Sequence, residues 1–486
     1  MSKKENAAAP DEKSKIADDS LNIGEKENTR PCKIKLKNLD PVGARDRVLD
    51  EHYQKMRFLT DRQKLWVHDG RRYGNFPHLA EGLALDVLKN IHLEYVPGML
   101  HVNEYGVQVE LKALLQFQAQ VRTLGMVQQT LKLARLDSRI HAVSKEFDAN
   151  PYEINLLNGL FNLESKTLTQ HDPSQLVTKL APVSWVPDAP CAFWKDFIED
   201  ITVGDKELAA YLQRLCGYCL SGSTQEEVLP ILYGAGANGK SIYLGTIRDI
   251  LGSGEYSHTL SPDSILNSST YGLPYEHRQL EGKRVALAIE VNRGSTLNEA
   301  VVKTLTGGDE TSGRAIGENP VQFKPQATII MAVNHLPGLV GSDRAIRRRL
   351  QVVPFNGSFD GKKRKEEIER QIMAEKEGVF DWMVRGFKEW REQGLNPPEA
   401  VLKATEEYFQ VNDHIGTYLA ERTVEDPAGK TPVKHLFDDY CAWARDSGLK
   451  PLGKHQLGDL LRSRGVRQDR AGSTRFWKGL VLNLAS

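Results

Sequence analysis

The sequence has no excess of either charge, because its 486 residues include 64 Lys and Arg against 64 Asp and Glu. Net charge therefore gives no sign of nucleic-acid binding, which must be argued from local charge. No apolar run approaches the roughly 20 residues that span a bilayer, so we expect no membrane contact. The N-terminus lacks the apolar core of a secretion signal. Five cysteines, an odd number, give no disulfide framework, and we expect a cytoplasmic protein.

One C-x-x-C pair occurs, formed by Cys216 and Cys219. A structural zinc site would need two more ligands at similar spacing, and none follows. We therefore predict two buried cysteines on a helix, where cysteine behaves as a small apolar residue.

Composition and periodicity divide the chain into four segments. Residues 1–38 are rich in Lys, Glu, Asp, Asn and Ala and predict a disordered leader, because they cannot bury enough apolar surface to offset the entropy of ordering. Residues 39–222 show mainly helical spacing, with a small β-hairpin around Asn158-Gly159. Residues 223–400 form an α/β domain, and residues 415–486 form a small tail of helices closed by a strand pair.

The α/β assignment rests on short apolar runs that alternate with helical stretches. Such runs are typical of strands that are buried on both faces of a sheet. The expected strands are Val228–Tyr233, Val285–Ile289, Thr328–Val333 and Leu350–Val353.

The segment after the first strand matches the phosphate-binding pattern G-x-x-x-x-G-K-[ST]. It reads Gly234-Ala235-Gly236-Ala237-Asn238-Gly239-Lys240-Ser241, and a helical run, Ile242–Leu251, follows. Glycines let backbone N–H groups turn towards phosphate oxygens, and the helix N-terminus adds its positive dipole end. In such loops the lysine reaches the β- and γ-phosphates and the serine hydroxyl ligates Mg²⁺. The sequence therefore predicts a site for ATP and Mg²⁺.

Three features further along are candidates for the catalytic side of this site. Glu290 ends the strand Val285–Ile289 and offers a carboxylate to metal or water, although such a glutamate can equally lie on the surface. Asn334 ends the next strand, where its amide can hold the attacking water or simply form a turn. The run Arg344-Ala345-Ile346-Arg347-Arg348-Arg349 is either a solvated face or an arginine finger for a neighbouring subunit.

The order of these motifs resembles superfamily 3 helicases of the phage and plasmid primase–helicase type, which are related to the poxvirus primase-helicase. The resemblance covers about residues 45–486. It is carried by the P-loop, Glu290, Leu297–Ala300, Lys303–Asp309, Asn334–Pro337, Arg348–Leu350 and Pro354-Phe355. It implies an AAA+ type P-loop ATPase core, an N-terminal mainly helical domain and a C-terminal winged-helix-like domain. It also implies a homo-oligomer, a hexameric ring that moves along single-stranded DNA held in its channel.

The resemblance assigns roles to individual residues. Lys240 and Ser241 fall on the Walker A pair and Glu290 on the Walker B acid, although the usual adjacent acid pair is absent. Asn334 falls on the polar sensor at the strand end. Arg349 falls best on the arginine finger, with Arg348 as the alternate. Lys303 lies where relatives place a basic residue that reaches the neighbour's nucleotide.

The segment Asp309–Lys324 lies where relatives carry the hairpin that contacts DNA in the channel. Arg314 and Lys324 are its basic residues, and its expected tip, Gly317-Glu318-Asn319, is not basic. Many relatives also carry a primase domain, which needs clustered carboxylates. The residues before Phe147 contain no Asp-apolar-Asp pair, so we expect no primase activity.

The end of the chain is locally basic. Gly453–Ser463 predicts a helix, and Val466–Arg470 and Thr474–Gly479 predict a two-stranded wing. This pattern resembles a winged-helix module that contacts duplex DNA; a solvated basic face on a protein-docking module is the alternative. The candidate DNA-binding residues of this tail are Lys454, Arg462, Arg464, Arg467 and Arg475.

These observations favour an ATP-dependent replicative DNA helicase of a phage, plasmid or mobile element. The alternative is an origin-binding or DNA-packaging ATPase that remodels DNA without processive unwinding. A small-molecule kinase would share the P-loop. The arginine run, the hairpin segment and the basic tail argue against a kinase, which needs no ring.

Overall fold

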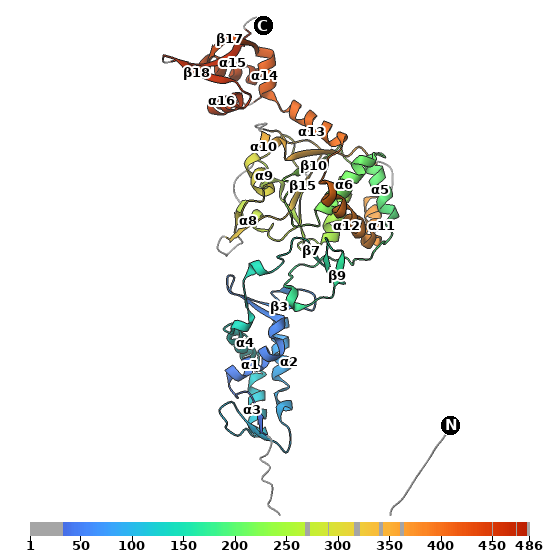
Figure 1. Cartoon of the computed structure of the whole chain (residues 1–486), viewed down its shortest axis with the longest axis vertical. Coiled ribbons are helices and arrows are strands. Elements are labelled where there is room, and N and C mark those ends of the chain that lie inside the picture. The colour runs from blue at the N-terminus through green and yellow to red at the C-terminus, as the bar shows by residue number, and fades with distance from the viewer. Residues whose placement is uncertain are drawn as a thin grey trace, which may run out of the picture. The chain divides into compact units, whose positions relative to one another are not determined.

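The structure is a computed structural model, and it describes residues 33–267, 273–289, 291–314, 321–339, 344–359, 364–449, 451–472 and 474–483. The chain separates into two compact units. The first comprises the chain up to His52 together with Ala80–Leu136, and the second comprises Tyr53–Leu79 and the chain from Asp137 onwards. Figure 1 labels many of the helices and strands of both units.

The first unit is mainly helical, and it covers only part of the segment 39–222 that the sequence assigned to one mainly helical domain. Its elements are β1 (Lys33–Lys35), α1 (Pro41–His52), α2 (Pro77–Leu88), β5 (Leu100–Val102), α3 (Leu111–Val121) and α4 (Leu124–Ala134). Strand β1 pairs in parallel with β5, so regular structure begins inside the segment 1–38 that composition assigned to a disordered leader. The sequence did not predict this strand, because its three residues, Lys-Ile-Lys, form no apolar run. The rest of that leader, residues 1–32, is outside the described residues.

The second unit begins with two small sheets. The first has the strand order β4 (Tyr73–Gly74), β3 (Lys64–His68), β2 (Met56–Leu59) and β6 (His141–Ala142). The second contains β7 (Glu153–Leu156), β8 (Gly159–Asn162) and β9 (Thr167–Thr169). Strands β7 and β8 are antiparallel, which confirms the hairpin around Asn158-Gly159. Gly159 has a φ of +146°, and a Cβ there would lie 2.3 Å from the carbonyl oxygen of Thr169, so a side chain does not fit.

A five-stranded parallel sheet forms the centre of the second unit. Its strand order is β11 (Ser257–Leu260), β12 (Val285–Ile289), β15 (Thr328–Val333), β10 (Leu229–Tyr233) and β16 (Leu350–Pro354). Four of these strands confirm the predicted apolar runs. Strand β11 was not predicted, because Ser-His-Thr-Leu is not an apolar run.

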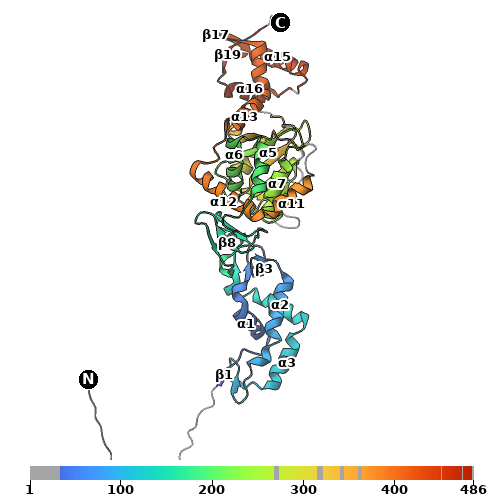
Figure 2. The same cartoon turned by 90° about the vertical axis from the view of Figure 1, so that its right-hand side faces the viewer.

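Helices cover both faces of this sheet. One face carries α5 (Ala192–Thr202), α6 (Lys206–Tyr218), α7 (Lys240–Leu251), α11 (Lys365–Ala374) and α12 (Lys376–Gln393), which Figure 2 shows together on the side facing the viewer. The other carries α8 (Leu273–Arg278), α9 (Glu299–Thr306), α10 (Arg344–Arg347) and α13 (Glu399–Val411). Alternate strand residues enter the two cores, with Leu232 and Ile330 in one and Ile231 and Met331 in the other. This double burial explains the unbroken apolar runs.

The cysteine pair lies in the first of these cores. Cys216 is on α6 and Cys219 is at its C-terminal end, and both are fully buried, as predicted. Burial raises the pKa of the Cys216 thiol to about 12. Its sulfur lies 3.0 Å from the hydroxyl of Tyr243 on α7, so the pair helps to pack α6 against the helix of the P-loop.

The tail contains three helices and a three-stranded antiparallel sheet. Its elements are α14 (His414–Arg422), β17 (Thr423–Pro432), α15 (Val433–Asp446), α16 (Lys454–Ser463), β18 (Arg467–Ala471) and β19 (Thr474–Leu482). Helix α16 and the β18–β19 pair lie where the sequence predicts them. Strand β17 adds a third strand that was not predicted, because Thr-Val-Glu-Asp-Pro-Ala-Gly-Lys-Thr-Pro shows no alternation. Among the described residues, none of the helices has the length and hydropathy needed to cross a membrane.

Candidate functional site

The P-loop connects the carboxyl end of β10 to the first turn of α7. Its backbone turns sharply, with φ values of +117° at Gly236, +47° at Ala237 and +84° at Gly239. A Cβ on Gly239 would lie 2.5 Å from Cγ2 of Ile201, so glycine is needed at this position for close packing as well as for backbone freedom. The N–H of Phe359 donates to the carbonyl of Ala237 at 2.9 Å and holds the outer turn of the loop. The strand–loop–helix context that the motif requires is therefore present.

The ammonium group of Lys240 is folded onto the loop itself. It donates to the carbonyl oxygen of Gly234 and to Oδ1 of Asn238, both at 2.7 Å. The Asn238 amide is oriented in turn, because its Nδ2 donates to the carbonyl of Phe355 at 3.0 Å. Both partners of Lys240 are neutral oxygens, and burial lowers its pKa to about 8. The loop therefore holds a buried cation that no carboxylate neutralises among the described residues.

A cavity of about 340 Å³ opens beside this lysine. Its lining includes the P-loop from Gly236 to Ile242, and it also includes Asn334, which directly follows β15. Strands β10 and β15 are adjacent and parallel, so their carboxyl ends deliver Lys240 and Asn334 to the same place. The hydroxyl-bearing Ser241 also lines the cavity. These three predicted residues are brought together.

Two further residues of this cavity were not chosen from the sequence. Phe359 and Lys365 both line it; Phe359 lies between β16 and α11, and Lys365 is the first residue of α11. The Phe359 ring packs on Phe197 with centroids 5.7 Å apart. Lys365 lies 3.7 Å from Glu369 in a charged run, which has the pattern of an ordinary solvated helix start. Nothing in that pattern separates Lys365 from a surface lysine.

Glu290, the expected Walker B acid, lies outside the described residues. Strand β12, which ends at Ile289, is paired with β15 and places Ile289 opposite Ala332. Among the described residues there is no cluster of three or more His, Cys, Asp and Glu side chains that could hold a metal ion.

The two finger candidates differ sharply in their surroundings. Arg349 is buried, with its side chain 7% exposed. Its guanidinium donates to Oγ1 of Thr306 at 3.1 Å, to the carbonyl of Ala345 at 2.9 Å and to Oε2 of Glu227 at 2.8 Å. Arg348 has 62% of its side chain exposed and donates to the same Glu227 oxygen at 2.7 Å. In the single chain, Arg349 is thus an internal anchor and Arg348 faces outwards.

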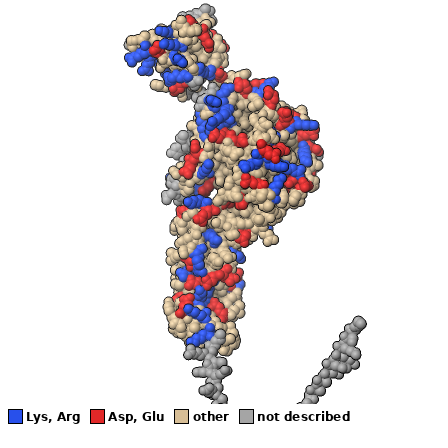
Figure 3. All heavy atoms as spheres, in the orientation of Figure 1, with Lys and Arg blue, Asp and Glu red and all other residues tan. Residues whose placement is uncertain are grey.

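Both arginines directly precede β16, so they lie at the amino-terminal ends of the parallel strands. The P-loop lies at the opposite, carboxyl ends. The register pairs Leu350 with Leu229 and Pro354 with Tyr233. Arg348 therefore lies six strand positions from the residue before the P-loop, which is about 20 Å at roughly 3.3 Å per residue. Figure 3 shows basic side chains gathered where α10 lies in Figure 1. Lys303 lies on α9, the helix whose Thr306 accepts from Arg349, and it is half-buried.

The described residues include the base of the hairpin that was expected to contact DNA. Strands β13 (Thr311–Gly313) and β14 (Val321–Phe323) are antiparallel, with Thr311 opposite Phe323. Arg314 directly follows β13 and Lys324 directly follows β14, where it is exposed. The tip that includes Gly317-Glu318-Asn319 is outside the described residues.

The tail residues proposed to bind DNA are not equivalent. Arg464 is paired with Asp413, the residue that caps α14, and Arg462 is paired with Asp459 at 2.5 Å. The other three, Lys454, Arg467 and Arg475, have no ion pair with any acid among the described residues. Figure 3 shows a concentration of basic side chains on the tail. Arg467 on β18 and Arg475 on β19 are exposed and lie on the strand pair that the sequence predicted as a wing.

Comparisons with known proteins match two segments of the chain to family models. Residues 46–203 match the model described as D5 N terminal like, and residues 232–349 match a family of unknown function, DUF5906. A protein named "Putative helicase" from Acanthamoeba polyphaga mimivirus is 27% identical over 328 residues, which is 62% of this chain and 34% of that protein. A "Putative primase" of African swine fever virus is 22% identical over 348 residues, which is 66% of this chain and 35% of that protein.

The chain thus spans about a third of the length of the curated relatives it matches. Among solved structures, the C-terminal region of NrS-1 is 14% identical, with a TM-score of 0.49 over 92% of this chain and 100% of that chain. The chain is similar to proteins of large DNA viruses that carry helicase and primase names, and its N-terminal part is similar to the corresponding part of D5-like proteins.

Proposed function

We propose that this chain is an ATP-hydrolysing DNA helicase of superfamily 3 that works as a ring of identical subunits. One observation carries the proposal. The cavity at the carboxyl ends of β10 and β15 brings the P-loop residues Lys240 and Ser241 together with Asn334. This is the combination needed to hold a nucleoside triphosphate by its phosphates and to act on its last phosphoanhydride bond.

The residues present suit a triphosphate. Lys240 is a buried ammonium whose partners are neutral oxygens, so an anion in the cavity would supply the missing counter-charge. Backbone N–H groups at the start of α7 add donors and the positive end of the helix dipole. The exposed hydroxyl of Ser241 would hold Mg²⁺, which when bound neutralises charge on the β- and γ-phosphates. Asn334 would orient the attacking water, and Glu290 would accept its proton or hold the metal.

The arginine geometry supports action between subunits. Arg348 is exposed and lies about 20 Å along the sheet from its own P-loop, so it cannot reach its own nucleotide without a large rearrangement. A neighbouring subunit in a ring could place its P-loop against this arginine. The strand order supports the AAA+ class that the motif order implies, because β15 is inserted between the P-loop strand β10 and β12.

The DNA assignment has separate support. The hairpin base presents Lys324, the tail presents Arg467 and Arg475, and the relatives named as helicases and primases come from DNA viruses. The alternative is an ATPase that remodels or packages DNA without processive unwinding. Its support is the same basic tail, which would bind duplex DNA equally well for either purpose.

Unwinding of a forked duplex distinguishes these functions. The proposal expects the full chain to displace a labelled strand from a fork in the presence of ATP and Mg²⁺, and Lys240→Ala to displace none. ATP hydrolysis stimulated by DNA without strand displacement would favour the remodelling ATPase. Phosphate transfer to a small molecule, with no effect of DNA on the rate, would refute both.

A further inference from the structure

A second cavity, of about 440 Å³, lies beside the hairpin base in the second unit. Its lining comes from the sheet with β2 and β3, from the segment before β7, and from β14 and the residues that follow it. The lining includes Arg62, Trp66, Ser144-Lys145, Phe147–Ala149, Thr178-Lys179, Glu281-Gly282, Val321–Lys324 and Gln326. The P-loop contributes nothing to it. It is therefore a site distinct from the nucleotide cavity.

The charges of this cavity leave an excess of unneutralised cations. Of its two acids, Glu281 is paired with Arg62 at 2.6 Å, and Asp148 accepts from the N–H of Thr178 at 2.9 Å. The three lysines, Lys145, Lys179 and Lys324, come from separate parts of the chain and make no ion pair with any acid among the described residues. Lysines without an ion pair that line one hollow attract a polyanion.

An aromatic ring lies among these cations. Trp66 lines the cavity and is half-buried, and its indole is held edge-on against Phe147 with ring centroids 5.0 Å apart. Packing on Phe147 fixes the indole without covering it fully. A fixed aromatic surface beside lysines is the combination with which proteins hold single strands, because bases stack on the ring while phosphates meet the cations.

We propose that this cavity binds a short stretch of single-stranded DNA, with phosphates at Lys145, Lys179 and Lys324 and a base against Trp66. The proposal rests on the proposed function, because it concerns the same DNA that the hairpin would contact. Lys324 directly follows β14, so the cavity begins where the hairpin ends.

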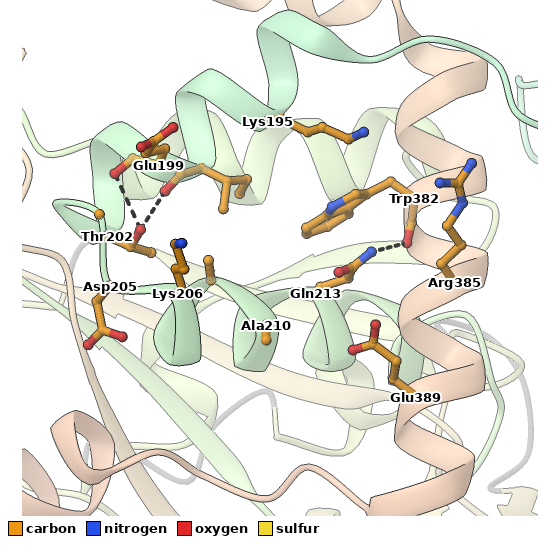
Figure 4. A pocket seen from close by; sticks show the side chains of 13 residues that line it. Lys195, Glu199, Thr202, Asp205, Lys206, Ala210, Gln213, Trp382, Arg385 and Glu389 are labelled. Carbon is orange, nitrogen blue, oxygen red and sulfur yellow. Dashed lines mark hydrogen bonds between the residues drawn. The ribbon is translucent and has the colours of Figure 1, made fainter.

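Another cavity of the same unit provides a matched control. It measures about 510 Å³ and lies between α5, α6 and α12, as Figure 4 shows. Its three basic residues, Lys195, Lys206 and Arg385, are matched by the three acids Glu199, Asp205 and Glu389. Trp382 lines it too, but that ring is 7% exposed. A charge-balanced cavity of this kind has no reason to bind a polyanion.

The test measures binding of fluorescein-labelled oligo-dT to the full chain by anisotropy across a salt series. Lys145→Gln combined with Lys179→Gln should weaken binding about tenfold and lower the slope of log affinity against log salt by about 1.4, which is 0.7 for each lost single-strand phosphate contact. The control, Lys195→Gln with Lys206→Gln, should bind as the wild type does. Trp66→Leu should weaken binding to oligo-dT but not to an abasic oligomer of equal length, and Trp66→Phe should restore most of it.

Three results would overturn the inference. If the double variant of Lys145 and Lys179 has the oligo-dT affinity and salt slope of the wild type, DNA binding in this cavity is refuted. The proposed function would still stand. Tighter binding of oligo-rU than of oligo-dT would refute the assignment to DNA. Failure of the wild-type chain to bind any oligonucleotide, with or without ATP, would refute the proposed function as well.

Discussion

The guanidinium of Arg349 donates from Nη2 to Oε2 of Glu227 at 2.8 Å. This contact joins the residue before β16 to the segment before β10. It lies at the amino-terminal ends of these two parallel strands, whereas the P-loop lies at the carboxyl end of β10. Arg348 shares the same carboxylate oxygen at 2.7 Å but is exposed. Glu227 has a φ of +51°, an uncommon backbone conformation for a glutamate. The structure thus gives two adjacent arginines different surroundings, with Arg349 buried among internal contacts and Arg348 exposed.

The first prediction compares what Arg349 and Arg348 contribute to the free energy of unfolding. Arg349→Ala removes three hydrogen bonds of a buried cation and should lower the free energy of unfolding by about 2–3 kcal/mol. Arg348→Ala removes an exposed pair and should change it by less than about 1 kcal/mol. Urea denaturation of both variants measures the difference. An Arg349→Ala protein of wild-type stability without ATPase activity would instead make Arg349 the finger.

The second prediction concerns action between subunits. Arg348→Ala should bind ATP normally and hydrolyse it poorly, because transition-state stabilisation is lost in the neighbour's site. Mixing it with Lys240→Ala subunits should restore partial ATPase activity, since some interfaces then combine an intact P-loop with an intact arginine. A mixture that stays inactive while rings of native size form would contradict this assignment. Activity of Arg348→Ala as a monomer would contradict the ring.

The third prediction concerns pH. Burial lowers the pKa of Lys240 from its ordinary value of 10.5 to about 8, and phosphate binding requires the charged ammonium. Binding should therefore be strongest at a pH well below 8, and as the pH rises through 8 the dissociation constant should increase, by up to about tenfold per pH unit. Titration of a non-hydrolysable, fluorescent ATP analogue from pH 7 to pH 9.5 tests this. Lys240→Arg, whose cation does not titrate in this range, is the control, and equal pH profiles for the two proteins would contradict the prediction.

The fourth prediction concerns Asn334, which shares the cavity with Lys240. Asn334→Ala should lower the rate of ATP hydrolysis by about 100-fold, as expected for losing one polar group that acts in the transition state. Binding of the ATP analogue should change by less than about threefold, because Lys240 and the loop N–H groups supply most of the phosphate contacts. The test compares the change in kcat with the change in Kd for the analogue. An equal fall in kcat and in affinity for the analogue would mean that Asn334 only binds nucleotide.

The fifth prediction concerns the tail. Arg467→Gln with Arg475→Gln should weaken binding of duplex DNA and lower the salt slope by about 1.8, which is 0.9 for each lost phosphate contact. Basal ATPase activity should not change. Arg464→Gln serves as a contrast, because its pairing with Asp413 predicts a loss of tail stability. Unchanged duplex affinity in the double variant would favour a tail that docks on protein.

Several elements could be predicted from the sequence because their signals are local. The P-loop is a contiguous motif, and the strands β10, β12, β15 and β16 are apolar runs because both faces of the sheet are covered. Strands β1 and β17 carry no such signal, because Lys33–Lys35 is short and mostly charged and Thr423–Pro432 shows neither an apolar run nor alternation.

Some residues of the nucleotide site could likewise be predicted from the sequence, and others could not. Asn334 could be placed because it ends a recognisable strand next to β10. Lys365 could not, because the fold brings it to the P-loop from more than 120 residues away. The resemblance preferred Arg349 to Arg348 as the finger. Their difference in exposure depends on Thr306 and Glu227, contacts that come from distant segments.

The proposed function places DNA-stimulated ATP hydrolysis in the cavity beside Lys240. The steady-state rate of ATP hydrolysis by the full chain, measured with and without single-stranded DNA and compared with that of Lys240→Ala, tests it. We expect a clear basal rate, a several-fold stimulation by the single strand and no measurable hydrolysis by Lys240→Ala. Hydrolysis by Lys240→Ala at the wild-type rate, or a wild-type rate that no DNA changes, would contradict it.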